Sequence, residues 1–172
     1  MKKLISAALG LLICMGAYAQ YEKVDELLRH FRQGDRISLD FGISHSGESH
    51  SIAEGKLELQ GKLYSVKAGD MTIICDGKTQ WTIDEAGQEI YLEQGGQLSS
   101  LLSNTGYIKK SLSSLNSSDN SICGVFAAGK DGSTKLDFKL ENITYGKASE
   151  DLSEFSLDCS EYQDPWVVTD LR

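Results

Sequence analysis

After its first twenty residues, this 172-residue chain has no run approaching the roughly 20 apolar residues that a membrane-spanning helix needs. It also lacks a cluster of lysines and arginines, and its formal net charge is −8. The first absence predicts a soluble mature protein. The second gives no reason to expect a nucleic acid or an anionic membrane as partner. No internal repeat or domain boundary is visible, so we expect a single domain.

Signatures of catalysis and of metal binding are missing as well. Gly77-Lys78-Thr79 resembles the end of a phosphate-binding loop, but the earlier glycine of that motif would fall at Thr72, within an apolar strand. No Ser/His/Asp or Cys/His set can be assembled. His45 and His50 could face each other across a hairpin, but no third metal ligand is near them in the sequence. We therefore expect no enzyme activity, no metal site and no cofactor.

What is present at the N-terminus is typical of an export signal. Lys2-Lys3 precede an apolar stretch from Leu4 to Met15, which is followed by the small-x-small sequence Ala17-Tyr18-Ala19. This order predicts a cleavable signal peptide over residues 1–19 and a mature domain over residues 20–172.

The cysteines leave two alternatives open. Cys14 could be the lipidated cysteine of a lipoprotein signal, although Leu12-Ile13 before it lack the small residue that such a signal prefers. Cys75, Cys123 and Cys159 are an odd number, so at most one pair can form within the mature chain. The sequence does not choose that pair, and the spacings match no zinc or redox motif.

The spacing of apolar residues changes from helical to β along the chain. One helical face carries Val24, Leu27, Leu28 and Phe31, and Gly34 is a plausible end of this helix. Apolar and polar residues then alternate over residues 37–43, which predicts a strand with one apolar face. Further strands are expected over residues 52–60, 63–67, 71–75, 80–83, 89–93, 121–127, 134–145, 154–158 and 166–170. Such regular short strands predict an antiparallel meander, interrupted over residues 95–119 by short helices or mobile loops.

One hairpin carries a resemblance to a known family. The apolar strand 71–75, the turn Asp76-Gly77-Lys78-Thr79, a strand led by Trp81 and the sequence Glu89-Ile90-Tyr91-Leu92 follow one another. This order resembles the central hairpin of the outer-membrane lipoprotein carrier (LolA) family. The N-terminal helix and the ending Phe155-x-Leu157 … Pro165 … Val168-x-Asp170-Leu171-Arg172 are also similar to compact LolA-like members.

The resemblance implies a mainly β (α+β) fold in the periplasm. It implies a curved antiparallel sheet that forms an incomplete β-barrel, with the N-terminal helix and short helices covering its concave face. From the alternation of the strands, we expect an acyl-chain cavity lined by Leu39, Phe41, Ile43, Leu57, Leu59, Ile73, Trp81 and Ile83. We expect a lid formed by Leu27, Leu28, Phe31, Leu98, Leu101 and Leu102.

The function implied is that of a monomeric carrier for lipoproteins or other acylated ligands. It would take its cargo from inner-membrane donor machinery and deliver it to outer-membrane acceptor machinery. Each methylene kept out of water in an apolar cavity would contribute about 0.8 kcal/mol. Such contacts have no directional requirement, so selectivity among cargoes would be loose.

One departure and two alternatives accompany this interpretation. Proteobacterial carriers place an arginine, commonly followed by proline, before the hairpin, whereas this chain has Gln60-Gly61-Lys62-Leu63. An ammonium cannot reproduce the planar contacts of a guanidinium, so an arginine-latched lid is not expected here. The main alternative is a secreted non-catalytic β domain with a general lipid-binding or structural role, whose apolar face is a packed core. An enzyme acting on envelope lipids is the third.

Overall fold

The computed structural model describes residues 21–48, 50–128 and 134–172. The predicted signal peptide, with Cys14, lies outside these ranges. Within them, no helix combines the length and the apolar character that crossing a membrane requires. The strands are β1 (Arg36–His45), β2 (Ser51–Gln60), β3 (Leu63–Ala68), β4 (Met71–Cys75), β5 (Thr79–Asp84), β6 (Glu89–Gln94), β7 (Leu112–Ser118), β8 (Ser121–Ala128), β9 (Thr134–Gly146) and β10 (Val167–Asp170). The short helices are α2 (Gln97–Ser103), α3 (Thr105–Ser111), η1 (Ser153–Phe155) and η2 (Cys159–Glu161).

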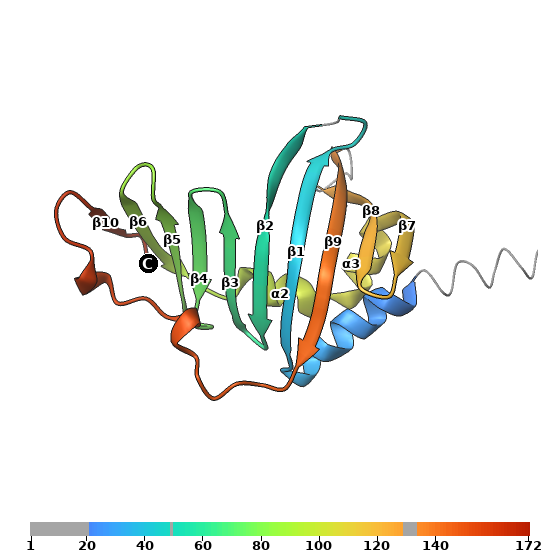
Figure 1. Cartoon of the computed structure of the whole chain (residues 1–172), viewed down its shortest axis with the longest axis horizontal. Coiled ribbons are helices and arrows are strands. Elements are labelled where there is room, and N and C mark those ends of the chain that lie inside the picture. The colour runs from blue at the N-terminus through green and yellow to red at the C-terminus, as the bar shows by residue number, and fades with distance from the viewer. Residues whose placement is uncertain (1–20, 49, 129–133) are drawn as a thin grey trace, which may run out of the picture.

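Ten described strands form one open sheet, in the order β10-β6-β5-β4-β3-β2-β1-β9-β8-β7 (Figure 1). Strands β1 to β6 follow one another as an antiparallel meander, and β9 returns to pair with the free edge of β1, where Ile37 lies opposite Tyr145. The edge strands β10 and β7 do not pair with each other. The mainly β prediction is therefore confirmed. One detail differs, because β10 runs parallel to β6, with Val168 opposite Ile90.

The N-terminal helix is helical throughout its described residues, 21–33. It ends as predicted at Gly34, which has a φ of 76°, a backbone conformation that glycine adopts without steric cost. The Gly34 N–H donates to the carbonyl oxygen of Phe31 at 3.1 Å. The predicted apolar face is also observed, since Val24, Leu28 and Phe31 are all buried.

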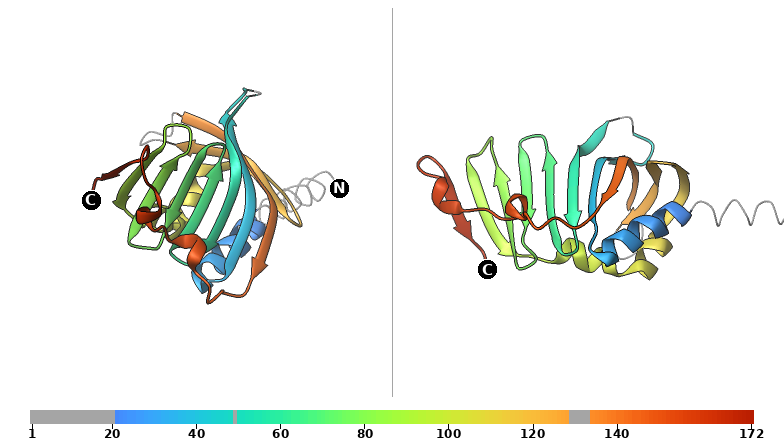
Figure 2. Two further views of the ribbon diagram at one scale, coloured as in Figure 1. Left: turned by 60° about the vertical axis from the view of Figure 1, so that its left-hand side comes forward. Right: turned by 60° about the horizontal axis from the view of Figure 1, so that its bottom comes forward.

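The two faces of the sheet are covered by different parts of the chain. The N-terminal helix, α2 and α3 lie on one side, and the segment over residues 147–166 crosses the other side (Figures 1 and 2). We call these sides the helix-covered face and the outer face. The strands at the two ends of the sheet point in clearly different directions in Figure 2, as the twist of a large sheet requires.

Two predicted features of the chain are wrong. Residues 154–158 were expected to form a strand, but they contain the end of η1 and irregular backbone. Residues 95–119 were expected to hold only helices or loops, but α2 and α3 are followed there by strand β7.

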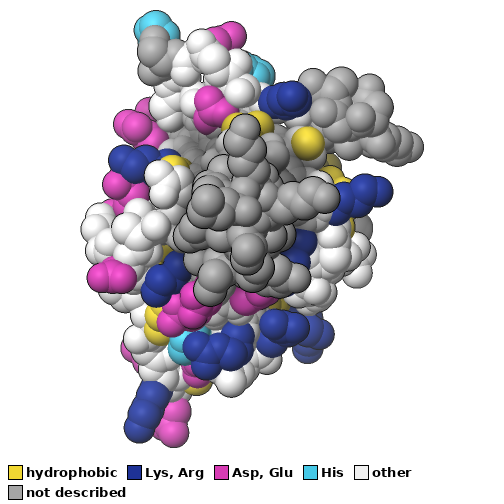
Figure 3. Space-filling model, turned by 90° about the vertical axis from the view of Figure 1, so that its right-hand side faces the viewer, with side chains coloured by type: hydrophobic (Ala, Val, Ile, Leu, Met, Phe, Trp, Pro, Cys, Tyr) yellow, Lys and Arg dark blue, Asp and Glu magenta, His cyan; other side chains and the backbone are white. Residues whose placement is uncertain are grey.

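Charged side chains of both signs are mixed over the described surface in Figure 3, and hydrophobic side chains show only as small patches. No large area of a single sign is visible on this view of the described residues. This distribution agrees with the absence of a basic cluster in the sequence.

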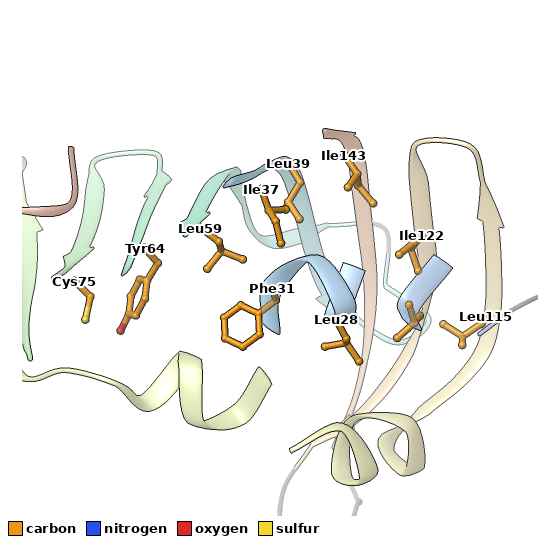
Figure 4. Close-up of a cluster of buried hydrophobic side chains, with 11 residues drawn as sticks. Leu28, Phe31, Ile37, Leu39, Leu59, Tyr64, Cys75, Leu115, Ile122 and Ile143 are labelled. Atoms are coloured by element: carbon orange, nitrogen blue, oxygen red, sulfur yellow. The ribbon is translucent and has the colours of Figure 1, made fainter. Parts of the chain in front are cut away.

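The core lies between the sheet and the N-terminal helix. Leu28 and Phe31 of the helix belong to one cluster of buried side chains with Ile37, Leu39 and Leu59 of the sheet (Figure 4). Ile37 is completely buried, and Leu28 is 2% exposed. Burying one such side chain contributes about 1.5–3 kcal/mol, so these contacts anchor the helix to the sheet.

Candidate apolar binding site

An apolar hollow of about 280 Å³ opens on the helix-covered face at one end of the core. Its lining side chains come from β1, β7, β8 and β9 and are all hydrophobic: Phe41, Ile43, Leu112, Phe126, Leu136, Phe138 and Leu140. The strand register brings them together, because Phe41 lies opposite Leu140 and Ile43 lies opposite Phe138. In the same way Phe126 lies between Leu112 and Leu136. The surface that results offers no hydrogen-bonding side chain to a ligand.

A second hollow, of about 720 Å³, lies beside α2 and α3. It is lined by Gly95, Gly96, Ser100, Leu101, Asn104 and Tyr107. The ring of Tyr107 stands edge-on to the ring of Phe126, with centroids 6.3 Å apart and an angle of 75° between the planes. Tyr107 thus borders the second hollow and contacts the wall of the first. It is 39% exposed, so its ring has room to move.

The predicted cavity residues fall into three groups. Phe41 and Ile43 line the apolar hollow. Leu39 and Leu59 are on the same face but are buried in the core beneath the N-terminal helix, with exposures of 3% and 4%. Leu57 and Ile73 are partly buried and pack against that core.

Trp81 and Ile83 do not share this face, so the prediction that they point into the same concavity is wrong. Trp81 lies opposite Ile74 of β4. Cys75, the residue after Ile74, belongs to the core on the helix-covered face. Successive side chains of a strand point to opposite faces, so Trp81 and Ile83 lie on the outer face. There they form a second cluster with Ile74 and Ile90, against which Leu157, Cys159, Tyr162 and Trp166 pack.

Five of the six predicted lid residues meet on the core. Leu28 and Phe31 are buried in it, and Leu27, Leu98 and Leu102 pack against it. Leu101 differs, because it points out of α2 and is 40% exposed. The helices therefore cover the sheet through the predicted side chains, with Leu101 at the border of the second hollow.

Five residues of the apolar hollow were not predicted as site residues: Leu112, Phe126, Leu136, Phe138 and Leu140. The alternation of Leu136, Phe138 and Leu140 was visible in the sequence and predicted an apolar strand face. What the sequence did not reveal is that β9 pairs with β1, and this pairing places Phe138 beside Ile43.

A series of hydrogen-bonded side chains extends from Tyr64, a buried residue of the core, along the helix-covered face. The Tyr64 hydroxyl donates to Gln80 Oε1 at 2.5 Å, and Gln80 Nε2 donates to Glu93 Oε2 at 3.1 Å. Burial is the main cause that raises the pKa of Tyr64 well above its usual value, with Cys75 and Glu93 adding to it. Every buried polar side-chain atom in the described part of the chain has a hydrogen-bond partner. These three side chains therefore supply one another's hydrogen bonds and have a structural role.

The three cysteines that the structure describes form no disulfide. Cys75 is completely buried, and Cys123 and Cys159 are partly exposed. Burial raises the pKa of the Cys159 thiol, which lowers its thiolate fraction and hence its reactivity. Residues 21–48, 50–128 and 134–172 contain no group of three or more His, Cys, Asp or Glu side chains placed to hold a metal ion. His45 is exposed on the β1–β2 hairpin.

Comparisons with models of protein families and with curated proteins gave no match for this chain.

Proposed function

We propose that this protein is a periplasmic carrier that shields the acyl chains of lipoproteins, or of similar acylated ligands, in an incomplete barrel covered by helices. The observation that carries the proposal is the hollow lined by seven hydrophobic side chains, without a polar one among them. A hydrocarbon chain is the ligand class that such a surface suits, because it gains about 0.8 kcal/mol for each methylene removed from water. The LolA-like hairpin over residues 71–92 points to the same function.

The size of the hollow suggests how a longer chain would be held. Ligand pockets commonly enclose about 300–1,000 Å³, and the apolar hollow lies just below that range at 280 Å³. The 720 Å³ hollow beside α2 and α3 would extend it if the Tyr107 ring moved away from Phe126. We infer that the covered state is the empty form and that loading displaces α3 together with α2.

The helices α2 and α3 suit the role of a movable cover. Each has seven residues, and short helices have little stability of their own. Leu98 and Leu102 hold α2 to the core by partly buried contacts only. Loading would exchange these contacts for contacts with the ligand, and release would restore them. This balance permits delivery, which a very tight binding site would prevent.

A fluorescent fatty acid titration tests the proposal. Phe138→Asp places a carboxylate in the apolar hollow, so we expect affinity to fall about tenfold or more, because an ionised group there must be desolvated by the ligand. Leu171→Asp is the matched control, since Leu171 is 60% exposed beyond β10, at the opposite edge of the sheet. The control should bind as the parent protein does. Circular dichroism and thermal melting establish that both variants are folded.

Equal affinity of Phe138→Asp and the parent protein would exclude the hollow as the binding site. Phe138→Trp provides a second measure, because it keeps the surface apolar while filling part of the volume. Native mass spectrometry of protein purified from a periplasm would identify the cargo. Co-purified triacylated lipoprotein is the expected result there.

A non-catalytic β domain with a general lipid-binding or structural role is the second candidate. It is favoured by the packing of Leu39 and Leu59, which are almost inaccessible beneath the N-terminal helix. In this case the hollow would bind single acyl chains weakly or not at all, and no lipoprotein would co-purify. The fatty acid titration and the mass spectrum together separate the two candidates.

A further inference from the structure

A third concavity, which we call the cleft, lies at the opposite end of the strands from the apolar hollow. It encloses about 460 Å³ between the N-terminal helix and α2. Phe31 and Arg32 form one wall, Ser99, Ser100 and Ser103 form the other, and Gly61, Lys62, Gly77 and Gly96 complete the lining. Gly77 and Lys62 lie side by side in this lining, since a Cβ added to Gly77 would lie 3.4 Å from the Cβ of Lys62.

The charge of this cleft is opposite to that of the whole protein. Its two ionisable side chains, Arg32 and Lys62, are both cationic, whereas the chain carries a formal charge of −8. No acidic side chain is among the residues that line it. The carboxylate of Asp76, next to Gly77 in the chain, is turned to its own loop, where Oδ1 accepts from the N–H groups of Lys78 and Thr79 at 2.8 Å. The carboxylate of Asp76 is thus engaged within its own loop and is not one of the groups that line the cleft.

Several hydrogen-bond donors in the cleft remain available. Arg32 Nε donates to the carbonyl oxygen of Leu28 at 3.1 Å, which orients the guanidinium and leaves its terminal N–H groups without a partner among the described residues. Ser99 and Ser103 use their hydroxyl donors on backbone carbonyls. Ser100 has no such bond in the described structure, so its hydroxyl can donate to a ligand.

We propose that this cleft binds a phosphate group, either as free phosphate or as the headgroup of an anionic lipid. Arg32 offers paired donors that match the oxygens of a phosphate, Lys62 adds a second positive charge, and Ser100 adds a neutral donor. The ligand would contact both the N-terminal helix and α2, so its binding would hold these two covering elements together. The inference does not depend on the proposed acyl-chain site. The cleft shares no lining residue with the apolar hollow, and it shares only Gly96 and Ser100 with the hollow beside α2 and α3.

The test is a titration followed by amide NMR and calorimetry, with inorganic phosphate as the first probe and dihexanoyl phosphatidylglycerol as the second. The amides of Gly61, Gly77 and Ser100 should shift. Arg32→Gln and Lys62→Gln should each weaken binding about two- to fivefold, and the double variant should abolish the shifts. Arg32→Lys, which keeps the charge but not the paired donors, should lose less than Arg32→Gln. Lys56→Gln is the matched control, because it removes one exposed positive charge of β2 outside the cleft.

The outcomes also distinguish the source of the phosphate. Shifts with inorganic phosphate assign a site for a free anion, and shifts with the lipid alone assign a headgroup site. Both support the proposal if the double variant removes them and Lys56→Gln does not. Unchanged cleft amides with either probe, or shifts that persist in the double variant, would overturn it. Phe138→Asp should leave the response intact, so a failure of the acyl-chain proposal would be recognised separately.

Discussion

Strand β1 carries one apolar face along its length, yet its two halves have different surroundings. Ile37 and Leu39 in the first half are buried under the N-terminal helix, with exposures of 0% and 3%. Phe41 and Ile43 in the second half point to the same side but line a hollow. The difference does not come from the strand itself. It comes from the helix, whose buried contacts Val24, Leu28 and Phe31 reach only part of the face.

Alternation of side chains along a strand decides which of them share a face of the sheet. The helices that cover this face decide which of them become part of the core. The packed half has the properties of a protein interior, in which every side chain is held by neighbours. The open half has the same composition without the cover. Three predictions test this distinction, and they are ordered by expected effect.

Truncation in the two halves should have unequal costs. Leu28→Ala leaves a cavity in the packed half, so we expect the free energy of unfolding to fall by about 2–5 kcal/mol. Leu140→Ala enlarges a hollow that already exists and should cost about 1 kcal/mol. Urea denaturation of both variants measures the difference. Equal losses would show that the hollow is packed as tightly as the core.

Alkaline pH should affect the packed half through Tyr145, which lies opposite Ile37 and whose ring stacks on His30 at 4.0 Å. Burial raises the pKa of Tyr145 to about 12, from an ordinary value near 10. Between pH 10 and pH 12 the Tyr145 hydroxyl is deprotonated in the unfolded chain but still protonated in the folded protein. Deprotonation therefore favours the unfolded chain, and the free energy of unfolding falls as the pH rises from 10 to 12.

The variant Tyr145→Phe has no such proton to lose. We expect its free energy of unfolding to fall less steeply than that of the parent protein over this pH range, by about 1 kcal/mol in total. Denaturation at a series of pH values checks the prediction. Tyr64, whose pKa burial also raises, is present in both proteins and cancels in the comparison. Parallel pH profiles would mean that the Tyr145 ring is already hydrated.

The smallest effect is expected at the border between the two hollows. Tyr107→Ala removes the edge-on contact with Phe126, an interaction of about 0.5–1.5 kcal/mol, and joins the 280 Å³ hollow to the 720 Å³ one. If the proposed function holds, long-chain fatty acids should gain affinity about twofold relative to short-chain ones. Tyr107→Phe keeps the ring and should not change this ratio. Identical ratios for all three proteins would contradict the role assigned to Tyr107.

Much of the sheet was predictable because alternation and turn residues agree along residues 36–94. Strand β4 was predicted with its observed ends, since Gly69-Asp70 precedes it and Asp76-Gly77 follows it. The first helix was predictable for a similar reason, because its apolar spacing and its terminal glycine point to the same structure.

Strand β7 could not be predicted because its spacing imitates a helix. Leu112 and Leu115 are three residues apart, but the register shifts between Ser113 and Asn116, and Ser114 has a φ of 51°. This irregularity turns both leucines to the same face of the sheet. A bulge of this kind leaves no signal in the order of polar and apolar residues.

The turn between β4 and β5 decides on which face of the sheet Trp81 lies, and the alternation within β5 does not. The β4–β5 hairpin pairs Cys75 with Gln80, so even-numbered residues of β5 share the face of odd-numbered residues of β4. A turn longer or shorter by one residue would reverse this assignment. Periodicity within each strand was therefore sufficient to predict the face on which Phe41 and Ile43 lie. It was insufficient to predict the face of Trp81 and Ile83.

The strip of chain that crosses the outer face has a consequence for the order in which the protein can be completed. Phe155 is 1% exposed, with the guanidinium of Arg36 over its ring, and Trp166 packs against the cluster of Trp81. Both aromatic groups follow, along the chain, the strands that they cover. Until the segment over residues 147–166 folds back, the outer face of the sheet exposes apolar side chains to any chaperone or neighbouring chain, so closing this segment ends an aggregation-prone stage of folding.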